Sequence, residues 1–166
     1  MEHLQKQVQE AYEEHADAIF RYCYFKLSDN EKAKDVVQDT FVRVWQYLSE
    51  GKNIDSIKPF LYTTARNLII DEYRKKKSSS LDTLMEGGFE PGVDIRHELE
   101  TRSDALQVIK SIQELPKSYS EILFMRYVDD LSVKEIAQTL GESENVISVR
   151  IYRGLAKLRI NLQPYE

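Results

Sequence analysis

Apolar residues recur every three or four positions through most of this chain, and that spacing is typical of amphipathic α-helices. No stretch shows the apolar–polar alternation of a half-buried β-strand. Because the longest break in the helical pattern lies between residues 77 and 103, we expect an all-α protein of two small helical domains. The expected helices cover residues 4–26, 30–48, 56–77, 103–114 and 118–128. Two further helices follow, the first beginning at Ser132, on either side of a break at residues 141–143.

Several helix starts are marked by a serine followed three residues later by a glutamate, the signature of a capping box. We expect such boxes at Ser28 and Glu31, at Ser118 and Glu121, and at Ser132 and Glu135. Further along, Gly141 suits the left-handed conformation that ends a helix, and Ser143 is able to cap the next helix. These signals place a tight turn between a short helix and a longer one.

A short helix, a tight turn and a longer basic helix form the layout with which many proteins read the DNA major groove. At helical spacing, the longer helix should bury Ile147, Ile151, Leu155 and Leu158. Its other side offers amide, basic and apolar groups that suit base edges and phosphates. The alternative is an ordinary αα-hairpin whose basic side only keeps the protein soluble. The candidate DNA-binding residues here are Ser143, Asn145, Val146, Val149, Arg150, Tyr152, Arg153 and Lys157.

The helix expected over residues 30–48 should bury Val37, Phe41, Val44 and Leu48. Its opposite face mixes carboxylates and amides with a valine, which fits a protein-docking surface and fits a solvated helix face equally well. This face comprises Asp35, Gln38, Asp39, Val42, Arg43 and Gln46.

The helix over residues 56–77 should bury Leu61, Ala65, Leu68 and Ile69. Its far side carries a hydroxyl, a guanidinium and an amide, which suit phosphates and base edges, and is bordered by tyrosine rings that can stack on bases. The closing lysines are also explained as partners of the helix dipole. The candidate DNA-binding residues of this face are Tyr62, Thr63, Arg66, Asn67, Arg74 and Lys77.

Residues 81–102 contain the pairs Gly87-Gly88 and Pro91-Gly92 and six acidic residues against two arginines, so we expect an acidic linker there. This divides the chain into domains over residues 1–80 and 103–166. The alternative is an ordinary solvent-exposed tether, because such tethers commonly have a charged composition.

The net charge of −5 is compatible with DNA binding because the basic residues are clustered, at residues 74–77 and along the last helix. The single cysteine and the three scattered histidines show no ligand spacing, so we expect no metal, no cofactor and no enzyme activity. No run approaches the roughly 18 apolar residues of a membrane span. We therefore expect a cytoplasmic protein without membrane insertion.

Three motifs in this order resemble a bacterial sigma factor of the small extracytoplasmic-function group of the sigma-70 family. They are DVVQDTFVRVW over residues 35–45, SIKPFLYTTARNLIIDEYRKKK over 56–77 and LPKSYSEILFMRYVDDLSVKEIAQTLG over 115–141. The resemblance covers nearly the whole chain, and it implies that residues 1–80 are sigma region 2 and residues 103–166 are sigma region 4.

The resemblance also implies partners. The face around Asp35 would dock on the clamp helices of the largest RNA polymerase subunit, and the flap of the second-largest subunit would be another contact. The helix over 56–77 and the loop before it would recognise and melt the −10 element, with Lys52, Asn53 and Asn67 near a pocket for a flipped base. The last helix would read the −35 element, the linker would thread the polymerase cleft, and an anti-sigma factor would hold the protein inactive.

The last helix departs from the family at Asn145-Val146 and Ser148-Val149, so promoter specificity does not transfer from relatives. Asn145 suits an adenine edge, and Val146 or Val149 suits a thymine methyl group. A stand-alone regulator that binds operator DNA without polymerase is the alternative function. It would leave the basic helix of the first domain unexplained.

Overall fold

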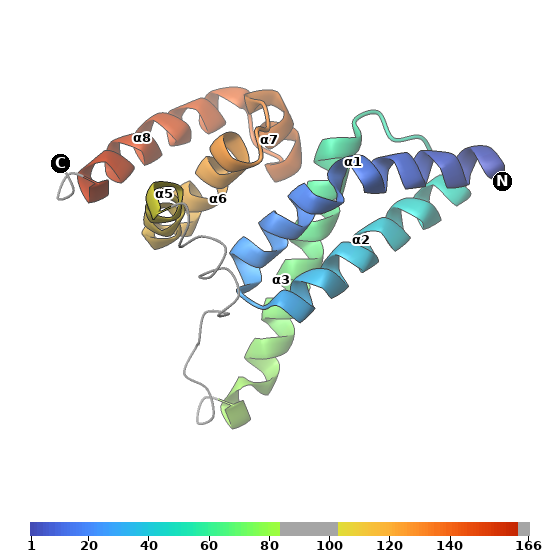
Figure 1. Ribbon diagram of the computed structural model, residues 1–166, viewed down its shortest axis with the longest axis horizontal. Helices are drawn as coiled ribbons and strands as arrows, with labels where there is room; N and C mark the ends of the chain where they lie inside the picture. The colour runs from blue at the N-terminus through green and yellow to red at the C-terminus, as the bar shows by residue number, and fades with distance from the viewer. Residues whose placement is uncertain (84–102, 163–166) are drawn as a thin grey trace. The chain divides into compact units, whose positions relative to one another are not determined.

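The computed structural model describes residues 1–83 and 103–162, which belong to two compact units (Figure 1). Within these two ranges every regular element is a helix, so the all-α prediction is confirmed. The predicted acidic linker lies outside the described residues except for 81–83, which are helical. In the described ranges, no helix has both the length and the apolar content needed to cross a membrane.

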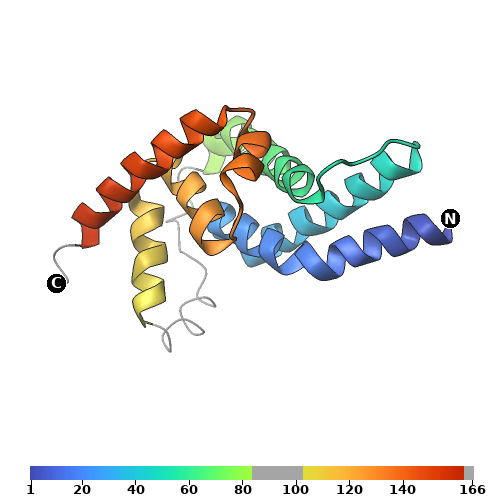
Figure 2. The same ribbon diagram turned by 90° about the horizontal axis from the view of Figure 1, so that it is seen from above.

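Unit 1 consists of three helices, α1 (Glu2–Leu27), α2 (Asn30–Ser49) and α3 (Ile57–Thr83). α1 and α2 lie side by side in opposite directions, and α3 packs against both (Figures 1 and 2). Their apolar stripes meet in a core that includes Ile19, Val44, Leu61 and Ile69, as helical periodicity predicts. α3 continues six residues past Lys77, beyond the end that the sequence pattern indicated.

The connection between α1 and α2 differs from its predicted form. Ser28 adopts the left-handed conformation (φ 53°) and its backbone N–H donates to the Tyr24 carbonyl at 2.8 Å, which closes α1. The N-cap of α2 is instead Asp29, whose carboxylate accepts a hydrogen bond from the backbone N–H of Lys32 at 3.1 Å. The predicted capping box of Ser28 and Glu31 is wrong because Ser28 is already used as the C-cap of the preceding helix.

Unit 2 contains α5 (Ser103–Glu114), α6 (Lys117–Leu123), a π-helical segment η1 (Phe124–Val128), α7 (Val133–Leu140) and α8 (Glu144–Leu162). α8 packs against α5, α6 and α7, and its apolar side forms the core with residues such as Ile122, Leu123 and Ile136 (Figure 2). The predicted capping box of Ser118 and Glu121 is wrong, because α6 starts one residue earlier, directly after Pro116, and has no side-chain cap.

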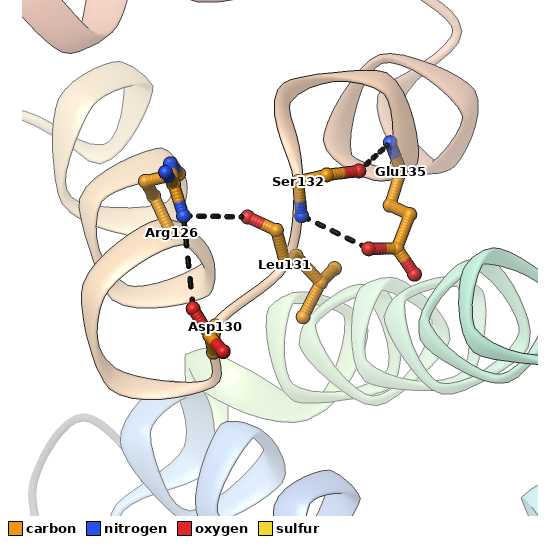
Figure 3. A network of polar contacts seen from close by, with 5 residues as sticks. All are labelled: Arg126, Asp130, Leu131, Ser132 and Glu135. Carbon is orange, nitrogen blue, oxygen red and sulfur yellow. Dashed lines mark hydrogen bonds and ion pairs between the residues drawn. The ribbon is translucent and has the colours of Figure 1, made fainter.

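The turn that leads into α7 is fixed by a polar network (Figure 3). Arg126 Nη1 donates to the Leu131 carbonyl at 3.4 Å and lies 3.7 Å from Oδ1 of Asp130, a residue in the left-handed region at φ 58°. Both hydrogen bonds of the capping box between Ser132 and Glu135 are present at 3.0 Å, so this prediction is confirmed. The direction in which α7 leaves the turn is therefore well determined.

Candidate nucleic-acid and protein interfaces

The turn between α7 and α8 has the caps that its sequence predicts. Gly141 is left-handed at φ 67°, and the next backbone N–H, that of Glu142, donates to the Ala137 carbonyl at 3.1 Å. The Ser143 hydroxyl oxygen accepts from the Val146 N–H at 3.2 Å, which caps α8. Two rigid helix ends thus meet at Glu142, and α8 has a fixed direction relative to α7.

The buried side of α8 contains Ile147, Ile151 and Leu158, with Leu155 half-buried, close to the prediction. Gly154 is also buried, and a Cβ atom there would lie 3.2 Å from Cδ1 of Leu123. Sequence reasoning missed this close approach of α6 and α8. The available signal was the seven-residue spacing from Ile147, which places Gly154 on the inward side.

The opposite side of α8 is the predicted reading face, and its side chains are accessible. Tyr152 is 78% exposed, and Ser143, Asn145, Val149, Arg153 and Lys157 are also exposed, while Val146 and Arg150 are half-buried. Lys157 Nζ lies 5.7 Å from the ring centroid of Tyr119, and Arg150 Nη2 lies 3.4 Å from Glu142 Oε1. Accessible amide, apolar and cationic groups along one helix are what contact with bases and phosphates requires.

On α3, most of the predicted DNA-binding residues reach the surface. Asn67, Arg74 and Lys77 are exposed, and Thr63 and Arg66 are half-buried. Together they form a polar and basic strip along one side of the helix.

Tyr62 does not belong to this strip, because its side chain is only 1% exposed and its ring meets that of Tyr22 edge to face at 5.4 Å. Its placement beside the DNA-binding face was wrong for a simple reason. Tyr62 precedes Ala65 by three residues and Ile69 by seven, so it shares their inward side of the helix.

The loop between α2 and α3 is contacted at its α2 end by the side chain of Lys52. Lys52 Nζ lies 2.5 Å from Glu50 Oε2 and 5.1 Å from the ring centroid of Tyr47, whose ring is in turn 4.9 Å from that of Phe60 in α3. The hydrogen bond that the Lys52 ammonium donates to the Glu50 carboxylate raises the pKa of Lys52 above its ordinary value. Asn53 is exposed in the same loop.

The predicted docking face of α2 is exposed throughout, and Val42 at its centre is 52% exposed. The same helix buries Val37, Phe41 and Val44, with Leu48 half-buried. Trp45, which the sequence reasoning did not include, is also partly exposed. A hollow of about 410 Å³ adjoins Asp39 and Arg43 of this face and Arg74 of α3. The accessible residues of the face are Asp35, Gln38, Asp39, Val42, Arg43 and Gln46.

Comparison with known proteins identifies both units. Residues 11–79 match the family described as Sigma-70 region 2, and residues 105–158 match Sigma-70, region 4. The extracytoplasmic-function (ECF) sigma factor SigL of Mycobacterium tuberculosis is 29% identical over 153 residues, which cover 92% of this chain and 86% of the relative. The ECF sigma factor SigW of Bacillus subtilis is 28% identical over 158 residues, covering 89% of this chain and 84% of the relative.

Solved structures have the same fold. CnrH, in complex with the cytosolic domain of CnrY, has a TM-score of 0.72 at 22% identity and covers 98% of this chain and 91% of its own. RpoE of Bartonella quintana, in complex with the anti-sigma factor NepR, has a TM-score of 0.72 at 21% identity, and the match covers 95% of this chain and 98% of the RpoE chain. The two family matches together span most of the chain. The chain therefore belongs to the sigma-70 family of RNA polymerase sigma factors, in its extracytoplasmic-function group.

Proposed function

We propose that three helices of this sigma factor have separate roles in promoter recognition. α2 docks on the clamp helices of the largest subunit of core RNA polymerase, α3 with the loop before it engages and melts the −10 element, and α8 reads the −35 element. The observation that carries the proposal is the presence of a polar and basic face in both units, on α3 and on α8. A stand-alone regulator that bound DNA through its helix–turn–helix alone would need only the face on α8.

The docking role of α2 is supported by the composition of its exposed face. Val42 is a half-exposed apolar side chain surrounded by the carboxylates of Asp35 and Asp39 and by glutamine amides. An exposed apolar centre with a polar rim is the usual anatomy of a protein interface. Because α2 also packs on α3, docking there would bring the adjoining α3 strip close to the polymerase-bound DNA.

The −10 role is supported by the strip on α3 and by the tethered loop. Arg66, Arg74 and Lys77 supply cations for phosphates, and the exposed amide of Asn67 can read a base edge. Capture of a flipped base needs a pocket that returns the lost stacking energy, a few kcal/mol. The contacts of Lys52 with Glu50 and Tyr47 hold the loop near its place before DNA arrives, and Asn53 is available beside it.

The −35 role is supported by the fixed turn before α8. Its exposed groups lie on one face of a helix whose N-terminus is capped by Ser143, so their spacing is set before binding. Arg150 and Arg153 suit guanine or phosphate, while Val146 and Val149 suit thymine methyl groups. The flap of the second-largest polymerase subunit would be a further partner of unit 2.

An anti-sigma factor is the expected regulator, and this protein would act in the cytoplasm, where polymerase and DNA are found. The support is that the similar RpoE was solved with an anti-sigma factor and the similar CnrH with a cytosolic partner domain. The exposed α2 face and the α8 reading face would be the surfaces such a regulator has to cover.

The proposal is tested by titrating labelled core polymerase with the full chain and its variants. Val42→Lys places a charge in the apolar centre of the docking face and should weaken binding by at least about tenfold. Glu13→Lys changes an exposed residue of α1 and serves as the matched surface control, with binding unchanged. Equal affinity of Val42→Lys and wild type would show that α2 does not dock in the proposed way.

A further inference from the structure

An ion pair joins the turn of the helix–turn–helix to the reading helix. Glu142 Oε1 accepts a hydrogen bond from Arg150 Nη2 at 3.4 Å, between residues that are eight positions apart. Both side chains are only about one-third exposed, at 39% for Glu142 and 35% for Arg150. Neither side chain is fully extended into solvent, and the contact gives the Arg150 guanidinium a preferred direction.

The acidic partner in this pair has a fixed backbone. The Glu142 N–H is held by the Ala137 carbonyl, Gly141 before it closes α7, and Ser143 after it caps α8. The carboxylate thus projects from the turn, outside α8. The Cα position of Glu142 is therefore set by the caps of both helices, and its side chain reaches Arg150 from there.

The location of the pair determines the direction of Arg150. Side chains on a helix lean toward its N-terminus, and a partner that precedes the helix draws the guanidinium further that way. Asn145, Val146 and Val149 lie in the same N-terminal half of α8. The charge of Arg150 is consequently brought to the end of the reading face where base edges are met in helix–turn–helix complexes.

We propose that Glu142 is a specificity-determining positioning residue, which orients Arg150 to read a guanine in the upstream promoter element. The proposal rests on the proposed role of α8. A guanidinium has five N–H donors, so a bond to Glu142 leaves others for the N7 and O6 atoms of guanine. Contact of Arg150 with a phosphate while it stays bonded to Glu142 would bring two negative charges close together, so the pair disfavours that alternative.

The test measures base preference at every position of the upstream element. A library randomised there is transcribed by core polymerase with the full chain, and is also bound by the full chain alone. Arg150→Ala should remove a guanine preference at one base pair. Glu142→Gln should reduce the same preference about tenfold and leave other positions unchanged, since one bidentate contact carries discrimination of about that size. Glu142→Gln should add nothing in the Arg150→Ala background.

A matched control separates orientation from charge. Glu144→Gln removes an identical charge from the first turn of α8 and leaves the pair between Glu142 and Arg150 intact. It should raise affinity for all sequences alike without changing any preference. The proposal is overturned if Glu142→Gln behaves like Glu144→Gln, or if Arg150→Ala loses no base preference. Failure of the wild type to direct any transcription would instead count against the proposed function. In that case the direct binding data would still show whether Glu142→Gln changes the base preference.

Discussion

The rings of Tyr22 and Tyr62 meet edge to face in the centre of unit 1, with centroids 5.4 Å apart and an interplanar angle of 68°. Tyr22 belongs to α1 and Tyr62 to α3, and both side chains are fully buried. The pair therefore joins the first helix to the helix that carries the −10 candidates. The orientation of the α3 strip depends on this core contact, although neither ring belongs to the strip.

Tyr62→Ala should lower the free energy of unfolding of unit 1 by about 3–5 kcal/mol, because it leaves a large cavity beside Tyr22. Tyr62→Phe keeps the ring pair and should have a much smaller effect. The only tryptophan, Trp45, lies in α2, so its fluorescence in a denaturant titration reports unit 1. If Tyr62→Ala left the stability unchanged and abolished −10 recognition, Tyr62 would be a DNA-binding residue and not a core residue.

Gly154→Val should destabilise unit 2 by about 1–3 kcal/mol through overpacking. Even a Cβ at this position would lie 3.2 Å from Leu123 Cδ1 and 3.4 Å from Tyr119 Cβ, so a branched side chain forces α8 away from α6. Gly154→Ala should cost much less, since better helix propensity returns about 1 kcal/mol. Amide hydrogen exchange along α8 measures both, and equal protection in the valine variant and wild type would contradict the close packing.

Ser132→Ala should lower the stability of α7 by about 1 kcal/mol, because it removes the acceptor for the Glu135 N–H. Glu135→Gln retains a side chain able to complete the capping box and is expected to be nearly neutral. Hydrogen exchange of the first-turn amides of α7 distinguishes the two. A larger loss in Glu135→Gln than in Ser132→Ala would mean that the carboxylate charge matters more than the serine cap.

Asp130→Val should destabilise unit 2 by about 1–2 kcal/mol, because a β-branched residue fits poorly at φ 58°. Asp130→Asn is the control, since asparagine tolerates this conformation and removes only an ion pair with Arg126 that is largely exposed to solvent. Thermal unfolding of the full chain compares them. If the asparagine variant were as unstable as the valine variant, the ion pair would be the important feature.

Arg153→Ala should weaken binding to the upstream element by about 1–3 kcal/mol if this exposed guanidinium makes a bidentate base contact. Affinity is measured by titrating a duplex of the selected element at fixed salt, with a scrambled duplex as the control. Unchanged affinity for both duplexes would remove Arg153 from the reading set. An equal loss on both would assign it to a phosphate.

Helical periodicity was sufficient to predict the helices and most of their exposed faces, because buried and exposed positions on α2 and α8 follow a regular spacing. Tyr62 was misplaced because its polar tip suggested a surface role, although its spacing from Ala65 and Ile69 indicates the inward side of the helix. Sequence reasoning also failed at the start of α2, where Ser28 and Asp29 are both good caps and only the left-handed backbone of Ser28 decides between them. The contact of Glu142 with Arg150 depends on side-chain direction across a turn, which residue spacing does not determine.

Promoter recognition by this protein is tested most directly by transcription in vitro with purified bacterial core RNA polymerase, with and without this protein, on random promoter sequences. We predict transcripts that require the protein and that come from templates sharing two elements at a fixed separation, one for α3 and one for α8. Absence of such transcripts, with tight binding of particular duplexes by the protein alone, would contradict the proposed sigma-factor roles of α3 and α8 and favour a stand-alone regulator.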